Sequence, residues 1–194
     1  MSLPGKPPTH YKVVSKDGRS AVRAEARSSA SLLRQRLERP ASSLGDVSFS
    51  WWVPQLLASG DVRQVGSEDA AARVVFAFGG DVSKLPMRTR MQFELMQALT
   101  GEPPPYATLM YVYDASAPVG SVVVNPRSDR IRKIVLDAGA DGLMRWRDHR
   151  RNLRADFILA FGEDPGPLQA VAVMTDTDNT GGHAETWYGP VTFH

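Results

Sequence analysis

The chain contains no cysteine, which excludes disulfide bridges, thiolate metal sites and cysteine nucleophiles. It also lacks any apolar run near the roughly 18 residues that a membrane-spanning helix needs, so no membrane span is predicted. The first eight residues include three prolines and no apolar stretch, unlike a secretory signal peptide. A serine-nucleophile elbow, a phosphate-binding loop and a dinucleotide-binding fingerprint are missing as well.

The composition that remains is typical of one soluble globular domain covering residues 1–194. Apolar residues make up 42% of the chain and charged residues 23%, with a formal net charge of +2. This mild positive charge does not by itself indicate nucleic acid. Residues 127–154 are rich in arginine but are interrupted by aspartates, which favours a charged rim, so we predict no nucleic-acid partner.

The dominant pattern is a series of short segments with the alternation of half-buried β-strands. The clearest is 47–53, where Phe49 and Trp51 share one face and Trp52 falls on the other. Residues 107–114 are apolar at nearly every position, which predicts a central strand buried on both faces. Further strands are predicted at residues 11–14, 20–27, 32–37, 73–78, 122–124, 131–136 and 143–147.

Two segments have helical periodicity instead. The first covers about residues 86–99, and we expect its methionines to plug an open end of the fold. The second covers about residues 152–161, with Asn152 as its N-cap and Gly162 as its stop.

The strongest turn signal lies near the end of the chain. An apolar run from Ala170 leads into the acidic segment 176–181, and a second strand follows from Ala184. Asp and Asn bond to nearby backbone amides and glycine allows a positive φ, so this stretch predicts a β-hairpin that adds the last two strands.

Together these elements predict a mainly β fold, an antiparallel β-sandwich of jelly-roll type with two inserted α-helices. A Rossmann or barrel fold would alternate strands and helices throughout, and this chain does not. The predicted core contains Phe49, Trp51, Val75, Leu109, Tyr111, Ile134, Val171, Val173 and Trp187.

Several outward-facing positions of the predicted strands carry cations, together with one large aromatic. They are Trp52, Arg23, Arg34, Arg73 and Arg132. If their strands share a sheet, an indole that stacks on sugar rings lies beside guanidinium groups that bind carboxylate or sulfate, which suits an anionic glycan. The alternative is a solvated face whose arginines pair with Glu25, Asp46 or Asp69.

The acidic segment offers a second candidate site. Asp176, Asp178 and Thr180 have the alternate spacing of the first half of an EF-hand loop, but Trp187 stands where the final Glu ligand should be. The sequence therefore favours a plain turn, with no cofactor, and leaves calcium as the alternative. His183 with Tyr188 or Tyr113, and an arginine, could form the base and acid set of a jelly-roll polysaccharide lyase, but no spacing requires this.

Distinctive short segments are spread along nearly the whole chain. In order they are Pro8-Thr-His-Tyr11, Ser29-Ala-Ser31, Ser48 to Val53, Tyr106 to Tyr113, Asn125-Pro126 with Asp129 to Ile134, Trp146-Arg147, Asp156-Phe157 with Phe161 to Glu163, Met174 to Gly181, and Trp187-Tyr-Gly189. In this order they resemble a bacterial family of proteins of unknown function, the one numbered 3047.

The resemblance implies a protein exported in Gram-negative bacteria, with a strand pattern similar to jelly-roll carbohydrate-binding modules and no established activity. Family members tend to carry an acidic residue where this chain has Pro190, which weakens the calcium alternative. They also have an export signal and one more strand upstream of Pro8, so we expect this chain to be trimmed.

The leading hypothesis is therefore a non-catalytic binding module of the cell envelope, periplasmic or otherwise exported, with a glycan as ligand. One alternative is a polysaccharide lyase or hydrolase. Another is a structural protein–protein interaction domain that pairs through an exposed edge strand. The oligomeric state is not predicted.

Overall fold

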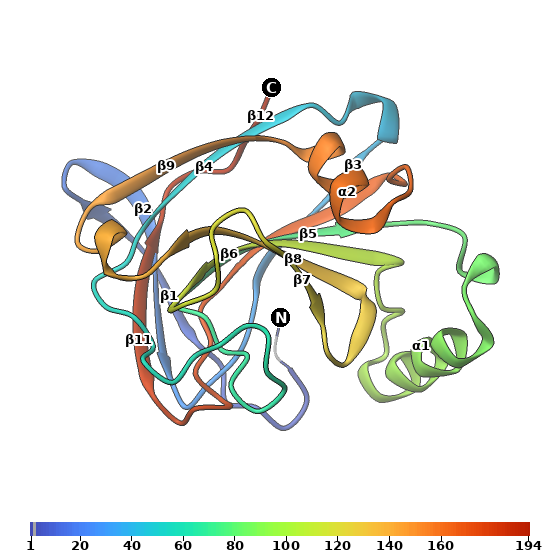
Figure 1. Cartoon of the computed structure of the whole chain (residues 1–194), viewed down its shortest axis with the longest axis horizontal. Coiled ribbons are helices and arrows are strands. Elements are labelled where there is room, and N and C mark those ends of the chain that lie inside the picture. The colour runs from blue at the N-terminus through green and yellow to red at the C-terminus, as the bar shows by residue number, and fades with distance from the viewer. Residues whose placement is uncertain (2) are drawn as a thin grey trace.

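The computed structural model describes residue 1 and residues 3–194, which form two six-stranded sheets packed face to face (Figure 1). The first sheet has the order β1 (His10–Lys16), β2 (Arg19–Arg27), β11 (His183–Tyr188), β4 (Asp46–Trp52) and β12 (Thr192–Phe193), and β9 (Trp146–Asn152) pairs with the other edge of β4. The second sheet has the order β3 (Leu33–Arg39), β10 (Leu168–Met174), β5 (Ala72–Phe78), β6 (Ala107–Asp114), β8 (Ser128–Ala138) and β7 (Val122–Asn125).

This architecture confirms the predicted mainly β sandwich. Neighbouring strands are antiparallel except for β6 and β8, which are parallel because the edge strand β7 is inserted between them in the sequence. Three short 3-10 helices lie in the connections, at Ala41–Ser43, Val82–Lys84 and Ala140–Gly142.

The predicted hairpin near the end of the chain is wrong. β10 lies in the second sheet between β3 and β5, whereas β11 lies in the first sheet between β2 and β4. The acidic segment between these strands is thus an arch that crosses from one sheet to the other. A crossing loop needs the same turn residues as a hairpin, so the local pattern did not distinguish the two.

The main core lies between the sheets and contains all but two of the predicted core residues. Trp187 is only half-buried, because Ala184, Thr186 and Tyr188 are the residues of β11 that point inward. Val75 is buried but belongs to a small cluster with Ala30, Ala172 and Met174, outside the main core.

Both predicted helices are present, as α1 (Met87–Thr100) and α2 (Leu153–Phe161). For α2 the caps are confirmed: the Asn152 side chain accepts a hydrogen bond from the Ala155 amide, and Gly162 adopts a φ of 72°. None of the described helices has both the length and the apolarity to cross a membrane.

The predicted burial of α1 is wrong. Met87 and Met91 are 68% and 63% exposed, and Thr89 is the one buried residue of the helix. Figure 1 shows α1 lying to one side of the two sheets. Its methionines therefore do not plug an end of the sandwich.

Candidate functional site

Three tryptophans form a row across neighbouring strands on the outer face of the first sheet. Trp146 of β9 pairs with Trp52 of β4, and Trp52 pairs with Trp187 of β11. The rings of Trp52 and Trp187 meet edge to face, with centroids 5.1 Å apart. Because side chains alternate along a strand, three indoles in one register row must lie on the same face.

Each indole of this tryptophan row has a cation above it. Lys16 Nζ lies 3.9 Å from the centroid of Trp52, Arg19 Cζ lies 5.1 Å from that of Trp146, and Arg23 Cζ lies 5.8 Å from that of Trp187. These contacts leave Trp52 only 8% exposed. The protein itself therefore covers the indole that the sequence places on the outer face.

The β1–β2 turn brings two of these cations over the row. Asp17 and Gly18 adopt φ angles of 52° and 77°, the left-handed pair of a tight two-residue hairpin turn. Lys16 and Arg19 flank this turn, so both extend from the tip of one hairpin.

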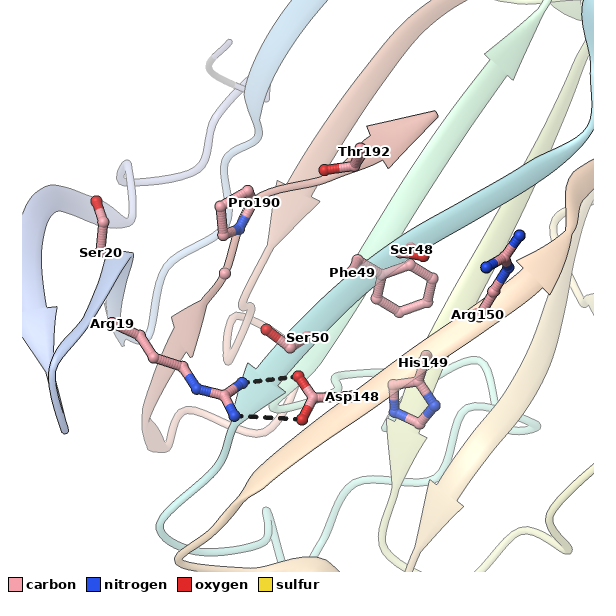
Figure 2. Close-up of a pocket in the computed structure, with 11 residues that line it drawn as sticks. Arg19, Ser20, Ser48, Phe49, Ser50, Asp148, His149, Arg150, Pro190 and Thr192 are labelled. Atoms are coloured by element: carbon pink, nitrogen blue, oxygen red, sulfur yellow. Dashed lines mark hydrogen bonds and ion pairs between the residues drawn. The ribbon is translucent and has the colours of Figure 1, made fainter. Parts of the chain in front are cut away.

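Beside the tryptophan row is a cleft of about 590 Å³, which we call the β4–β9 cleft (Figure 2). Its lining combines four hydroxyl side chains with charged groups from β2 and β9. The lining residues are Arg19, Ser20, Ser48, Phe49, Ser50, Asp148, His149, Arg150, Gly189, Pro190 and Thr192.

Arg19 connects the β4–β9 cleft to the tryptophan row. Its guanidinium donates to Asp148 Oδ1 at 2.7 Å and to Oδ2 at 3.4 Å (Figure 2). The same guanidinium also lies over the ring of Trp146. The indole N–H of Trp146 is buried and has no hydrogen-bond acceptor among the described residues. The site thus offers aromatic faces, hydroxyls, a carboxylate and guanidinium groups within one region.

A buried carboxylate behind the cleft connects the two sheets. Asp137 of β8 accepts hydrogen bonds from Trp51 Nε1 at 2.8 Å, His149 Nε2 at 2.9 Å and Arg147 Nε at 2.9 Å. Burial alone would raise the pKa of Asp137, but the hydrogen bonds from His149, Arg147 and Trp51 lower it to about 2. Asp137 thereby fixes β4 and β9, the two strands that carry the floor of the cleft. Sequence reasoning missed this residue, which follows the apolar part of a predicted strand.

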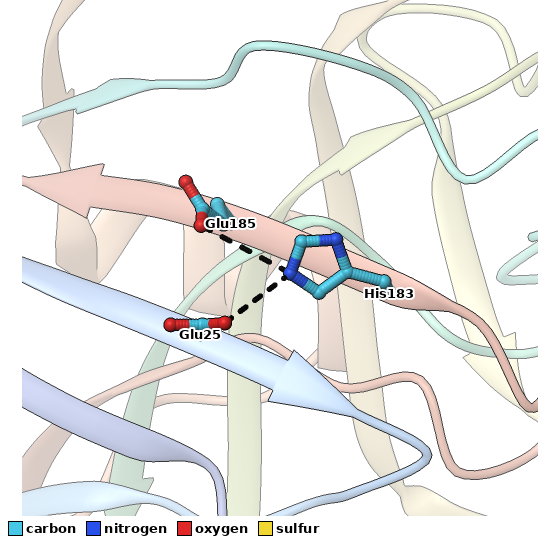
Figure 3. Close-up of side chains that lie close together, drawn as sticks. All are labelled: Glu25, His183 and Glu185. Atoms are coloured by element: carbon cyan, nitrogen blue, oxygen red, sulfur yellow. Dashed lines mark ion pairs between the residues drawn. The ribbon is translucent and has the colours of Figure 1, made fainter.

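A second polar cluster on the same outer face contains Glu25, His183 and Glu185 (Figure 3). His183 Nε2 lies 3.6 Å from a Glu25 oxygen and 3.9 Å from a Glu185 oxygen. This residue set could ligate a metal, but Arg23 pairs with both carboxylates and Arg27 pairs with Glu25. The hydrogen bond from Arg27 is the main influence that lowers the pKa of Glu25. The cluster is therefore already charge-compensated by its own arginines.

Comparison with known families identifies the chain. Residues 1–192 match the family described as "Protein of unknown function (DUF3047)". The chain belongs to the DUF3047 family. No match was found among curated proteins.

Among solved structures, this DUF3047 protein is similar to the xyloglucanase domain of NopAA, a type three effector from Sinorhizobium fredii, in complex with cellobiose. The two are 12% identical, and the alignment covers 98% of this chain and 90% of the other, with a TM-score of 0.46.

The five ligand-binding residues predicted for this DUF3047 protein do not share one sheet. Arg23 and Trp52 lie on the outer face of the first sheet. Arg34 and Arg73 lie in the second sheet, where they pair with Glu102 and with Asp176. Arg132, also in the second sheet, donates to the Asp129 carbonyl and lies over Phe161.

The two residues of the catalytic alternative, His183 and Tyr188, point to opposite faces of β11. His183 is half-buried on the outer face of β11, whereas the Tyr188 side chain points inward, and its hydroxyl donates to the Met174 carbonyl. Burial raises the pKa of Tyr188 far above its ordinary value, so this hydroxyl is a poor acid. The structure does not bring the two groups together.

The acidic arch has its own internal partners. Asp69, which the sequence suggested as an arginine partner, accepts hydrogen bonds from the backbone amides and side chains of Asn179 and Thr180. Asp176 is buried against Arg73, and Asp178 pairs with Lys6 at 2.7 Å. Although Asp69, Asp176 and Asp178 are close enough together to hold a metal, each carboxylate already has a donor.

Proposed function

We propose that this DUF3047 protein is a non-catalytic binding module that takes a glycan in the β4–β9 cleft and over the tryptophan row. The observation that carries the proposal is three indoles in one register row beside a cleft lined by hydroxyls and arginines. Indole faces contact the apolar faces of sugar rings, while hydroxyl and charged side chains bind sugar hydroxyls.

Moving the cations away from the tryptophan row costs a ligand little free energy. Arg19 and Asp148 are both exposed, and an exposed ion pair contributes about 0.2–1 kcal/mol. A cation–π contact at an exposed site adds about 0.5–1 kcal/mol. The tip of the β1–β2 hairpin can therefore uncover Trp52 and Trp146 at a cost that a few sugar contacts offset.

The charge around the cleft favours an acidic glycan over a neutral one. The lining of the cleft carries two arginines, Arg19 and Arg150, against one carboxylate, Asp148, although Arg150 also pairs with Asp46 outside the lining. A uronate or sulfate group gives Arg19 an alternative bidentate partner while the ring stacks on an indole.

A glycan array followed by titration of tryptophan fluorescence tests the proposal. We expect a uronate-bearing or sulfated glycan to bind, and Trp146→Ala to weaken binding about tenfold because an aromatic contact of roughly 1–1.5 kcal/mol is lost. Arg36→Ala, on the second sheet, is the matched control and should bind as the parent does. If no neutral or acidic glycan binds, or if Trp146→Ala binds as tightly as the parent, the proposal fails.

The family resemblance leads us to propose that this binding takes place in the cell envelope. Fractionation of native cells that recovers the full-length protein in the cytoplasm alone would contradict this location.

A further inference from the structure

A second cavity, of about 820 Å³, lies on the outer face of the second sheet. Its walls come from β3, from the end of α1 and from Pro103, Pro104 and Pro105. Three alanines, Ala77, Ala170 and Ala172, form much of its floor, so we call it the alanine groove. Its volume is within the roughly 300–1,000 Å³ of small-molecule sites.

The floor of the alanine groove follows two register rows across the sheet. One row places Arg36 beside Ala170, Ala77, Thr108 and Ile131, and the next places Arg34 beside Ala172, Val75 and Met110. Small side chains leave an apolar channel that crosses five strands. Four inter-strand spacings of about 4.8 Å make this channel roughly 19 Å long.

One end of both rows is built to hold a carboxylate. Arg34 Nη1 and Nη2 each lie 3.1 Å from Glu102 Oε2, and Arg36 Nη2 lies 2.5 Å from Glu102 Oε1. Glu102 comes from the connection between α1 and β6, outside the sheet. The protein's own carboxylate therefore occupies an arginine fork at the mouth of the channel.

That internal carboxylate is exchangeable. Glu102 and Arg36 are both exposed, so water screens their ion pair and it contributes little to stability. The groove wall next to it is adaptable, since Met96 and Met110 are flexible side chains that fit ligands of differing shape.

The lining also decides which ligand chemistry fits. No aromatic side chain lines the alanine groove among the described residues, so sugar rings have no stacking partner there. An apolar channel that ends at two arginines is complementary to an apolar chain that ends in an anion.

We propose that the alanine groove binds a single-chain carboxylic amphiphile of the fatty-acid class. The chain lies along Ala170, Ala172 and Ala77, and its carboxylate replaces that of Glu102 on Arg34 and Arg36. This site is independent of the glycan proposal, because it lies on the other sheet.

Calorimetric titration of the full chain with dodecanoate, and with dodecanol as the uncharged comparator, tests the inference. We expect saturable one-to-one binding of dodecanoate. Arg34→Gln should weaken it about tenfold or more and leave dodecanol binding unchanged, because a charge-assisted hydrogen bond is lost. Glu102→Gln should instead tighten dodecanoate binding several-fold, because the internal competitor is removed.

Ala172→Phe and Trp146→Ala complete the design. The phenyl ring of Ala172→Phe fills the channel, so both ligands should lose binding in protein that circular dichroism shows to be folded, even if packing against Val75 and Met174 lowers its thermal transition. Trp146→Ala, on the first sheet, should bind dodecanoate as the parent does. The inference is overturned if dodecanoate does not bind, if Ala172→Phe binds it normally, or if Glu102→Gln weakens binding as Arg34→Gln does.

Discussion

Removing the charge of Asp137 should destabilise the protein by about 3 kcal/mol at neutral pH. Asp137 is 4% exposed and accepts hydrogen bonds from Trp51, His149 and Arg147. In Asp137→Asn the NH2 group of the new amide is itself a hydrogen-bond donor, so it cannot accept the hydrogen bonds that the carboxylate accepts from these three side chains. Breaking a buried ion pair costs about 3–5 kcal/mol, and we expect the low end because the Arg147 side chain is 39% exposed and can be rehydrated.

The same carboxylate should make stability fall in acid. Its pKa is about 2 in the folded protein and about 3.9 in an unfolded chain. Between these values the unfolded state binds more protons, so stability is fully present above about pH 4 and is lost as the pH falls toward 2. A difference of about 2 pH units corresponds to about 2.5 kcal/mol.

Urea unfolding at pH 7 and at steps from pH 5 toward pH 2, as far as a native baseline persists, measures both effects. In Asp137→Asn the part of the fall in unfolding free energy between about pH 4 and pH 2 that is due to this group should be absent. Asp148→Asn, an exposed neighbour on β9, is the matched control and should change stability by less than about 0.5 kcal/mol. An Asp137→Asn variant with the parent's acid dependence, or with its full stability at pH 7, would refute the role of this carboxylate as the link between the sheets.

Three further predictions follow from other buried charges. Burial lowers the pKa of the fully enclosed Lys133 to about 8. The unfolded chain therefore binds more protons between pH 8 and 10.5, and the unfolding free energy of the parent should rise by up to about 3 kcal/mol over this range. A Lys133→Met variant with the same rise would contradict this. Asp69→Asn should lower stability by about 2 kcal/mol in thermal unfolding through the lost hydrogen bonds of the arch, whereas an equal loss in Asp178→Asn would argue against it. Calorimetry should detect no submillimolar calcium binding, because the arch carboxylates already have donors, and a calcium signal abolished by Asp178→Ala would disprove that.

Local features of the fold were predictable because they depend on neighbours in the sequence. The caps of α2 follow from Asn152 and Gly162, and the two faces of β4 follow from the alternation around Trp51 and Trp52. Strand pairing is different, since it depends on contacts between distant segments. The loop between β10 and β11 has the residues of a tight turn, yet Asp69, more than 100 positions earlier, holds it as an arch between sheets.

The candidate site was only partly predictable for the same reason. Trp52 was identified from its unexpected face, but its neighbours Trp146 and Trp187 come together only through register. Trp187 was expected in the core, but the last strand has large aromatics at two adjacent positions, and alternation alone does not say which one points inward. Arg34 and Arg73 were grouped with Trp52 because all three occupy outward-facing positions of predicted strands, and sheet membership separates them.

The four tryptophans offer the most direct measurement of the central claim. Three lie in the row, and Trp51 is buried with its indole N–H held by Asp137. In a nitrogen-15 spectrum of the indole groups, titration with acidic glycans should shift the signals of Trp146, Trp52 and Trp187 and leave Trp51 in place. A panel in which every indole signal stays unmoved, or in which Trp51 alone responds, would contradict binding at the β4–β9 cleft.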